Sequence, residues 1–293
     1  MLREKLSPRA LHEHRDEWED LTSEELLALC EEDGETVEET MPFYEEMAER
    51  VRLALEEREA LGVDFFSETE IPETIRNVMA ANDFARRQMT GVRDLWTESE
   101  SDEVVDVFDK PDELDRVFDT IEKSHRETLT EERETDDISY DRIGELTRMA
   151  GHISFYHAVR RYQSYDIPLM TEQGVLDCHV TVRDGRGNER GTVEITADND
   201  ALGRLQATFR VSGTRVNGFI TAERSESIEA YQSMLENLEQ NLTESGFTMD
   251  GNRLLQGNRK SLLVGNATEG AKNQDLYKVA KCFLQSIQRR NKA

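Results

Sequence analysis

The sequence predicts an α+β protein. An acidic, loosely packed and partly disordered helical half (residues 1–164) precedes a small domain of antiparallel sheet and helix (residues 165–293). Two observations on apolar spacing support this: helical periodicity before the boundary and strict alternation after it. A third is the charge, because residues 1–150 contain 18 Lys and Arg against 45 Asp and Glu, whereas residues 151–293 contain 18 against 17. We therefore expect two regions with different roles.

The helical half is predicted from four amphipathic segments. A helix over residues 41–61 has Thr40 as N-cap and Gly62 as C-cap. The other three are expected over residues 72–90, 111–130 and 139–163. The connecting segments 97–106 and 130–137 are rich in charge, so we expect them to be mobile and open to proteolysis.

The sheet is predicted to begin after Pro168. Apolar residues alternate with polar ones from Leu176 onward, and a Gly-rich turn over residues 183–188 and a Ser212-Gly213 hairpin punctuate the run. This pattern favours a four-stranded antiparallel meander with one apolar face and one polar face. His179 occupies a polar position in the alternation, so we expect it to face solvent.

Two helices are predicted to cover the apolar face. A stripe from Ile228 to Leu242 gives the first of them, which Ser245-Gly246 ends. A short strand is expected within residues 247–256 and a loop over 257–270. The last helix, over residues 271–290, buries an apolar stripe and presents a basic face that includes Lys278 and Lys281.

The overall charge limits the classes of partner. A formal net charge of -26 would repel the phosphates of nucleic acid and an acidic membrane leaflet. The chain has no apolar window approaching about 18 residues and its start lacks an apolar signal core. We therefore expect a cytoplasmic protein without a nucleic-acid partner or membrane insertion. Halophilic adaptation ranks low, because it should acidify the whole surface.

Catalytic and metal-binding motifs are missing from the sequence. The three cysteines lie far apart, which favours neither a disulfide framework nor a zinc site. The histidines lack metal-ligand spacing, so exposed or satisfied side chains are the expectation. His152 and His157 are five residues apart and do not share a helix face well. We expect no catalytic residue, no cofactor and no metal, and an enzyme is the lowest-ranked hypothesis.

A basic, polar surface is the candidate site for protein binding. The open sheet face should present arginines among uncharged polar residues, and the last helix should add two lysines. The predicted site residues are Arg204, Gln206, Thr208, Arg210, Arg215, Asn217, Lys278 and Lys281. Either the acidic half of the chain or an external protein could use this surface, and solubilising charge is an equally weighted alternative.

Residues 202–247 resemble part of a known family. They contain a Leu-Gly-Arg-Leu-Gln-Ala strand, a hairpin, a second strand over residues 216–222, a polar link and a leucine-stripe helix that ends before Phe247. This order resembles the C-terminal domain of flagellar hook-length control proteins of the FliK type, in a clostridial-like variant. Residues 71–81 are similar to a helical segment upstream of it. An acidic helical half stands where the family has a long Gln-, Pro- and Ser-rich ruler.

The resemblance implies a non-enzymatic role in the bacterial flagellum. Members of the family bind the export-gate protein FlhB and switch the type III secretion apparatus from hook to filament substrates, and they can themselves be exported through it. The alternative is a cytoplasmic flagellar export chaperone or adaptor that holds a basic client through its acidic helices.

Overall fold

The described residues of the computed structural model form an α+β fold. They are residues 69–86, 90–133, 140–171, 174–185, 191–198, 203–225, 227–250, 254–257 and 272–289, with single residues 22, 56 and 66. Contacts divide the chain into one unit of residues 1–89 and 147–155 and another of residues 90–146 and 156–293. This division differs from the predicted boundary at residue 164, because the contacts group residues 90–146 with the sheet. The expected helix at 41–61 lies outside the described residues.

The first unit contains α6 (Ile75–Arg86) and the middle of α10 (Tyr140–Arg160). Phe84 and Phe155 meet edge to face with ring centroids 5.6 Å apart. Beside them, Nε2 of the buried His152 lies 2.9 Å from Oδ2 of Asp83. An aromatic pair and one side-chain hydrogen bond therefore hold the two helices together.

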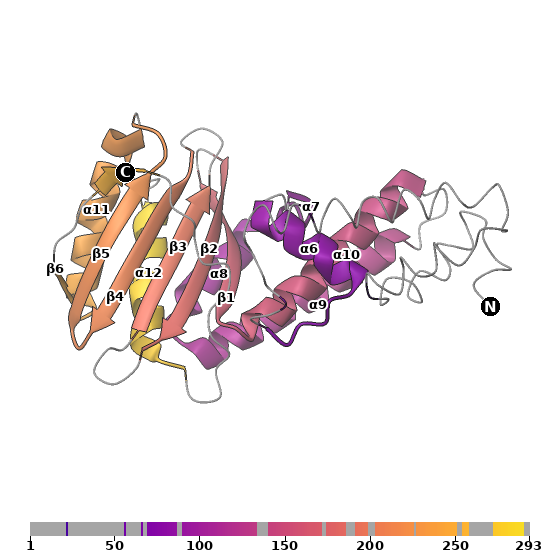
Figure 1. The fold of residues 1–293 in the computed structure, drawn as a ribbon, viewed down its shortest axis with the longest axis horizontal. Helices are drawn as coiled ribbons and strands as arrows, with labels where there is room; N and C mark the ends of the chain where they lie inside the picture. The colour runs from indigo at the N-terminus through magenta and orange to yellow at the C-terminus, as the bar shows by residue number, and fades with distance from the viewer. Residues whose placement is uncertain are drawn as a thin grey trace, which may run out of the picture. The chain divides into compact units, whose positions relative to one another are not determined.

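The second unit is built around a seven-stranded sheet, in which the strands lie side by side in chain order from β1 to β5 (Figure 1). The five antiparallel strands are β1 (Ser164–Thr171), β2 (Gly174–Asp184), β3 (Gly191–Asp198), β4 (Leu205–Ser212) and β5 (Arg215–Ala222). The predicted meander is confirmed from β2 onward. The structure adds β1 at one edge and two short parallel strands at the other.

A helical crossover produces the parallel part of the sheet. After β5 the chain forms α11 (Ser227–Glu244) and then returns to pair with β5 in β6 (Thr248–Asp250) and β7 (Leu254–Gln256). Gly246 ends α11 in the left-handed region, at φ 84°. There the Phe247 N–H donates to the Leu242 carbonyl at 2.9 Å. The predicted helix stop is therefore confirmed.

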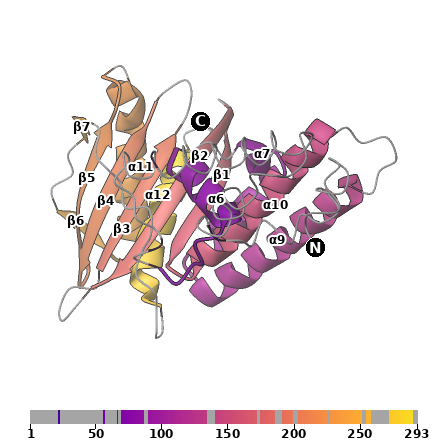
Figure 2. The same ribbon diagram turned by 45° about the vertical axis from the view of Figure 1, so that its right-hand side comes forward.

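The apolar face of the sheet is covered by α11 and α12 (Gln274–Arg289), as Figure 2 shows. Leu238 and Leu242 of α11 and Phe283 of α12 join one core with the apolar residues of the strands. The rings of Phe209 and Phe283 lie 5.6 Å apart at this interface. The apolar stripes of the two amphipathic helices thus pack against the apolar face of the meander.

The segment before the sheet is more ordered than the sequence predicts. It contains α7 (Thr90–Arg93), α8 (Glu98–Val107) and α9 (Pro111–Arg133). The prediction of a mobile segment at 97–106 is wrong, because α8 starts with a capping box between Thr97 and Glu100 and buries Val104 and Val105 in the core. The helices predicted at 111–130 and 139–163 are confirmed as α9 and α10.

Helix α8 covers one edge of the sheet. It packs against β1, and the hydroxyl group of its buried Ser101 donates to the Pro168 carbonyl. This contact occupies one backbone acceptor of the edge strand and so hinders pairing with another chain there. Within the ranges that the structure describes, every helix falls short of the length and apolar character that crossing a membrane demands.

Candidate interaction face of the sheet

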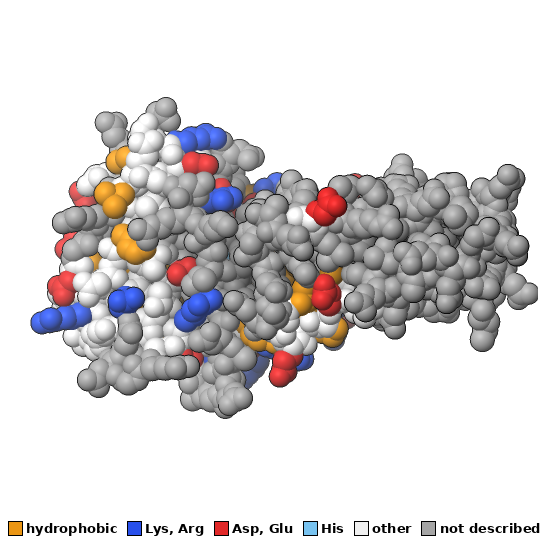
Figure 3. Space-filling model, viewed as in Figure 1, with side chains coloured by type: hydrophobic (Ala, Val, Ile, Leu, Met, Phe, Trp, Pro, Cys, Tyr) orange, Lys and Arg blue, Asp and Glu red, His pale blue; other side chains and the backbone are white. Residues whose placement is uncertain are grey.

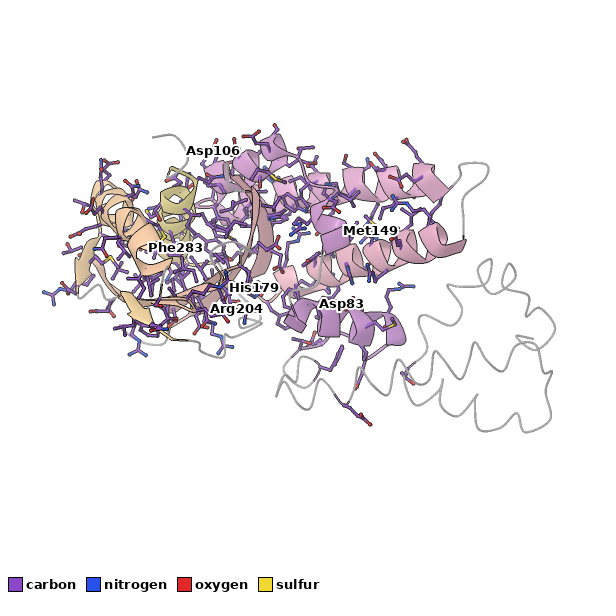
Figure 4. The ribbon with its side chains drawn as sticks, turned by 90° about the horizontal axis from the view of Figure 1, so that it is seen from above. Asp83, Asp106, Met149, His179, Arg204 and Phe283 are labelled. Carbon is purple, nitrogen blue, oxygen red and sulfur yellow. The ribbon has the colours of Figure 1, made fainter. Side chains whose placement is uncertain are left out.

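Strand alternation gives the sheet a polar face opposite α11 and α12. Residues that pair directly across antiparallel strands project to the same side. One row on this side contains Thr192, Arg210 and Asn217, and the next contains Glu194, Thr208 and Phe219. In Figure 4, the labelled Arg204 and His179 lie on the opposite side of the sheet from Phe283.

Six of the predicted site residues share this polar face but differ in exposure. Arg210, Arg215 and Asn217 are exposed near the β4–β5 hairpin, whereas Thr208 is half-buried. Gln206 is buried farther along β4, and Arg204 just before that strand is half-buried. The sequence therefore predicts the face correctly, and among these six residues the exposed side chains are those near the hairpin.

The structure separates Lys278 and Lys281 from the six sheet residues. Both belong to α12, whose apolar stripe is turned toward the opposite face of the sheet. The Lys281 ammonium group donates to Oδ1 of Asp109 at 2.7 Å and to the Asp106 carbonyl. Lys278 lies 3.7 Å from Asp275 on its own helix. The predicted single surface that combines sheet and helix is therefore not formed.

Acidic neighbours offset the arginines on the polar face. The Arg204 Nε atom donates to Oδ2 of Asp198 at 2.8 Å, and its backbone N–H donates to Glu223. Arg215 lies 3.9 Å from Asp250 of β6. Figure 3 accordingly shows basic side chains interspersed with acidic ones over the sheet. The face has mixed charge, which a count of arginines along the strands could not reveal.

Two hydrophobic side chains lie on the polar face farther along β5, away from the hairpin. Leu255 of β7 pairs with Thr221 and so projects to the polar side, where it is 48 % exposed. No other large hydrophobic side chain among the described residues is exposed. Phe219 projects to the same side from β5 and is half-buried. Neither residue is among the predicted site residues, although Phe219 stands out in the sequence as an aromatic residue in a polar register position.

His179 is buried within a hydrogen-bond network, so the prediction that it faces solvent is wrong. Its exposure is 2 %, with Nδ1 3.2 Å from Oδ1 of Asp166 and Nε2 3.2 Å from Oγ of Ser164. Thr181 Oγ1 also lies 3.1 Å from Nε2. Alternation shows which face a residue occupies, but not whether that face is covered.

The Ser164–His179–Asp166 order is that of a nucleophile, a base and an orienting acid. A nucleophile also needs access to its substrate, and Ser164 is 0 % exposed. Thr181 competes with it for the same imidazole nitrogen. The contacts therefore satisfy buried polar groups at the β1–β2 edge rather than open a site for chemistry.

A second charged network joins α9 to the end of α10. The buried Arg160 Nη2 atom donates to Oδ1 of Asp119 at 2.7 Å and to Oε2 of Glu122 at 3.2 Å, and lies 2.8 Å from Nδ1 of His157. Burial raises the pKa of Glu122, while Arg160 and His157 oppose that rise. The Asp119, Glu122 and His157 ligand atoms could hold a metal ion. The guanidinium group already supplies the positive charge there, and a metal would be repelled by it.

An open depression of about 480 Å³ lies where α8 turns into α9. Its lining residues are Lys110, Pro111, Asp112, Glu113, Arg116, Lys272 and Gln274. Two of the three cations have carboxylate partners, since Lys110 lies 3.0 Å from Glu113 and Lys272 lies 2.6 Å from Asp115. The lining is therefore of mixed charge and does not single out one class of ligand.

Comparisons with known proteins found no match to a protein-family model, to a curated protein or to a solved structure.

Proposed function

We propose that the sheet-bearing unit is a protein-binding module whose partner docks on the polar face along β5, from the β4–β5 hairpin to β7. We call this surface the outer corner and define it by Arg210, Arg215, Asn217, Phe219 and Leu255. The observation that carries the proposal is the exposed Leu255 beside the half-buried Phe219. A large apolar side chain in water gains most when a partner covers it.

The composition of the outer corner supports a protein partner. Aromatic residues and arginine are enriched among the residues that dominate binding energies, and a polar rim around them helps to exclude water. Here Leu255 and Phe219 provide the apolar centre, and the exposed Arg210 and Asn217 provide polar contacts on its border. Because the charge of the face is mixed, we expect shape and apolar contact to contribute more than electrostatic attraction.

The burial of the Ser164–His179–Asp166 network favours a binding role over an enzymatic one. A hydrolytic role for Ser164 would require a substrate to reach its hydroxyl group, which is fully buried. The outer corner is exposed and contains no comparable relay among its five residues. We therefore propose that the protein is not an enzyme.

The specific partner that we propose is the flagellar export-gate protein FlhB, with a role in hook-length control. This assignment rests on the sequence resemblance of residues 202–247. The order of β4, the hairpin, β5, a link and α11 is the arrangement on which the resemblance depends. The chaperone alternative is less favoured, because carboxylates such as Asp109, Asp115 and Asp119 already pair with cations of the chain itself.

The test measures binding of the full chain to the purified cytoplasmic domain of the export gate. Leu255→Asp should weaken binding at least about tenfold, which corresponds to about 1.4 kcal/mol. Lys278→Glu is the matched control, because Lys278 lies on α12 behind the sheet, and it should leave affinity unchanged. Failure of the unmodified chain to bind would remove the flagellar assignment.

The wider proposal is tested separately by site-specific photo-cross-linking in the native cell. A cross-linker at position 255 should capture one defined protein, and a cross-linker at position 278 should not capture it. The same protein captured from both positions, or no protein captured from position 255, would rule out the outer corner as the binding surface.

A further inference from the structure

An imidazole buried between α8 and α9 has a feature that neither the fold nor the outer corner explains. His125 of α9 is 4 % exposed, and its ring meets the indole of Trp96 edge to face at 5.7 Å. Its Nε2 atom lies 3.5 Å from Oε1 of Glu100 on α8. The backbone of Leu95 accepts a hydrogen bond from the ring.

These contacts leave one ring nitrogen with an unfavourable neighbour. A neutral imidazole has one N–H group, and here the Leu95 backbone accepts it. Nε2 then presents a lone pair to a carboxylate oxygen, and this nitrogen has no hydrogen-bond partner in the described structure. Two acceptors that face each other at 3.5 Å bind a proton between them if the cost of burying charge permits it.

Two opposing effects act on the pKa of His125, and they have different sources. Burial disfavours the charged ring and lowers the pKa of His125, whereas the Glu100 carboxylate acts in the opposite direction. Glu100 is the charged group that faces the ring from α8. The segment that precedes α8 contributes Trp96 and the Leu95 backbone, which are uncharged.

Glu100 connects this imidazole to the start of α8. Its Oε2 atom accepts hydrogen bonds from the Thr97 backbone N–H at 2.7 Å and from the Thr97 hydroxyl at 2.9 Å. Its own N–H donates to Oγ1 of Thr97 at 3.3 Å, which completes the capping box. One carboxylate therefore serves both the N-cap of α8 and the imidazole of α9.

We infer that His125 and Glu100 form a proton-responsive joint between α9 and α8. Uptake of one proton by Nε2 replaces the acceptor–acceptor contact with a charge-assisted hydrogen bond to Glu100. The carboxylate then shares its charge between the imidazolium ion and the Thr97 cap. Because α8 covers the β1 edge and Ser101 donates to the Pro168 carbonyl, the joint links pH to the helix that protects this edge.

The fluorescence of Trp96 reports the state of the joint directly. The sequence contains two tryptophans, so Trp18→Phe leaves Trp96 as the single emitter. A protonated imidazole in contact with an indole quenches its emission. In this background, emission should fall between pH 8 and pH 5, with a midpoint below the ordinary histidine value of 6.5. His125→Gln should abolish the transition, and His157→Gln, on α10, should preserve it.

The effect of Glu100→Gln on the midpoint of this transition distinguishes the joint from a histidine that is only buried. Glu100→Gln removes the group that favours the charged ring while burial remains, so the midpoint should move to lower pH. Circular dichroism at pH 8 checks that each variant folds. If His125→Gln does not fold, imidazole resonances of the unmodified chain and of Glu100→Gln supply the same test, because one resonance should titrate below pH 6.5 and shift lower in the variant. An unchanged transition in His125→Gln, or a midpoint that Glu100→Gln leaves in place or raises, would overturn the inference.

Discussion

The ammonium group of Lys281 lies 2.7 Å from Oδ1 of Asp109, and it also donates to the Asp106 carbonyl at the end of α8. This contact joins α12, near the end of the chain, to a segment about 170 residues earlier. Both side chains are mostly buried, at 19 % and 25 % exposure. A lysine that the sequence suggests for partner binding therefore serves internal packing, and the acidic and basic parts of the chain meet within one unit.

Replacing Lys281 with Met should lower the free energy of unfolding by about 1–2 kcal/mol, because a charge-assisted hydrogen bond in partly buried surroundings is lost. Urea-induced unfolding of the full chain measures the change. Lys110→Met is the control, since the Lys110–Glu113 pair is about half exposed. It should cost at most about 0.5 kcal/mol. Equal losses in the two variants would contradict an internal role for Lys281.

Leu238→Ala should destabilise the protein by about 2–5 kcal/mol, because Leu238 is fully buried in the core between α11 and the sheet. Arg210→Ala should change the free energy of unfolding by at most about 0.5 kcal/mol, since Arg210 is exposed on the opposite face. Thermal or urea unfolding provides both values. Similar losses at the two positions would mean that the faces of the strands have been assigned the wrong way round.

Gly218→Ala should be destabilising by about 1–3 kcal/mol. A Cβ atom at this position would lie 2.5 Å from Cδ1 of Phe209 on the neighbouring strand, and the fully buried Phe209 ring is fixed against Phe283. Combining the change with Phe209→Leu should recover part of the loss, because the smaller side chain makes room. Additive losses in the double variant would show that steric conflict with Phe209 is not the cause.

Arg160→Met should cost about 2–4 kcal/mol, because the buried guanidinium group contacts the Asp115 carbonyl through Nη1 and three side chains through Nη2, and its loss leaves Glu122 without compensation. Adding Glu122→Gln should restore much of the stability, since the uncompensated charge is then removed as well. A double-mutant cycle based on urea unfolding measures this coupling. A coupling energy near zero would indicate that the network contributes nothing beyond its separate side chains.

The helices of the second unit show which elements a local sequence pattern can predict and which it cannot. Helices α9, α11 and α12 could be predicted from sequence, because the helical spacing of their apolar residues determines which face is buried. Helix α8 could not, although its Thr97–Glu100 capping box is visible in the sequence. Its short, highly charged sequence resembles a mobile link, and only packing of Val104 and Phe108 against β1 and α12 makes it a stable helix.

The polar face shows the same division between local and tertiary information. Alternation by itself determined that Arg204, Arg210 and His179 share one side of the sheet, because successive side chains in a strand point to opposite faces. Tertiary structure alone decided that His179 is buried, that Arg204 pairs with Asp198, and that Lys281 binds Asp109 behind the sheet. Exposure and charge pairing depend on segments that are distant in sequence, and no local pattern encodes which of them come together.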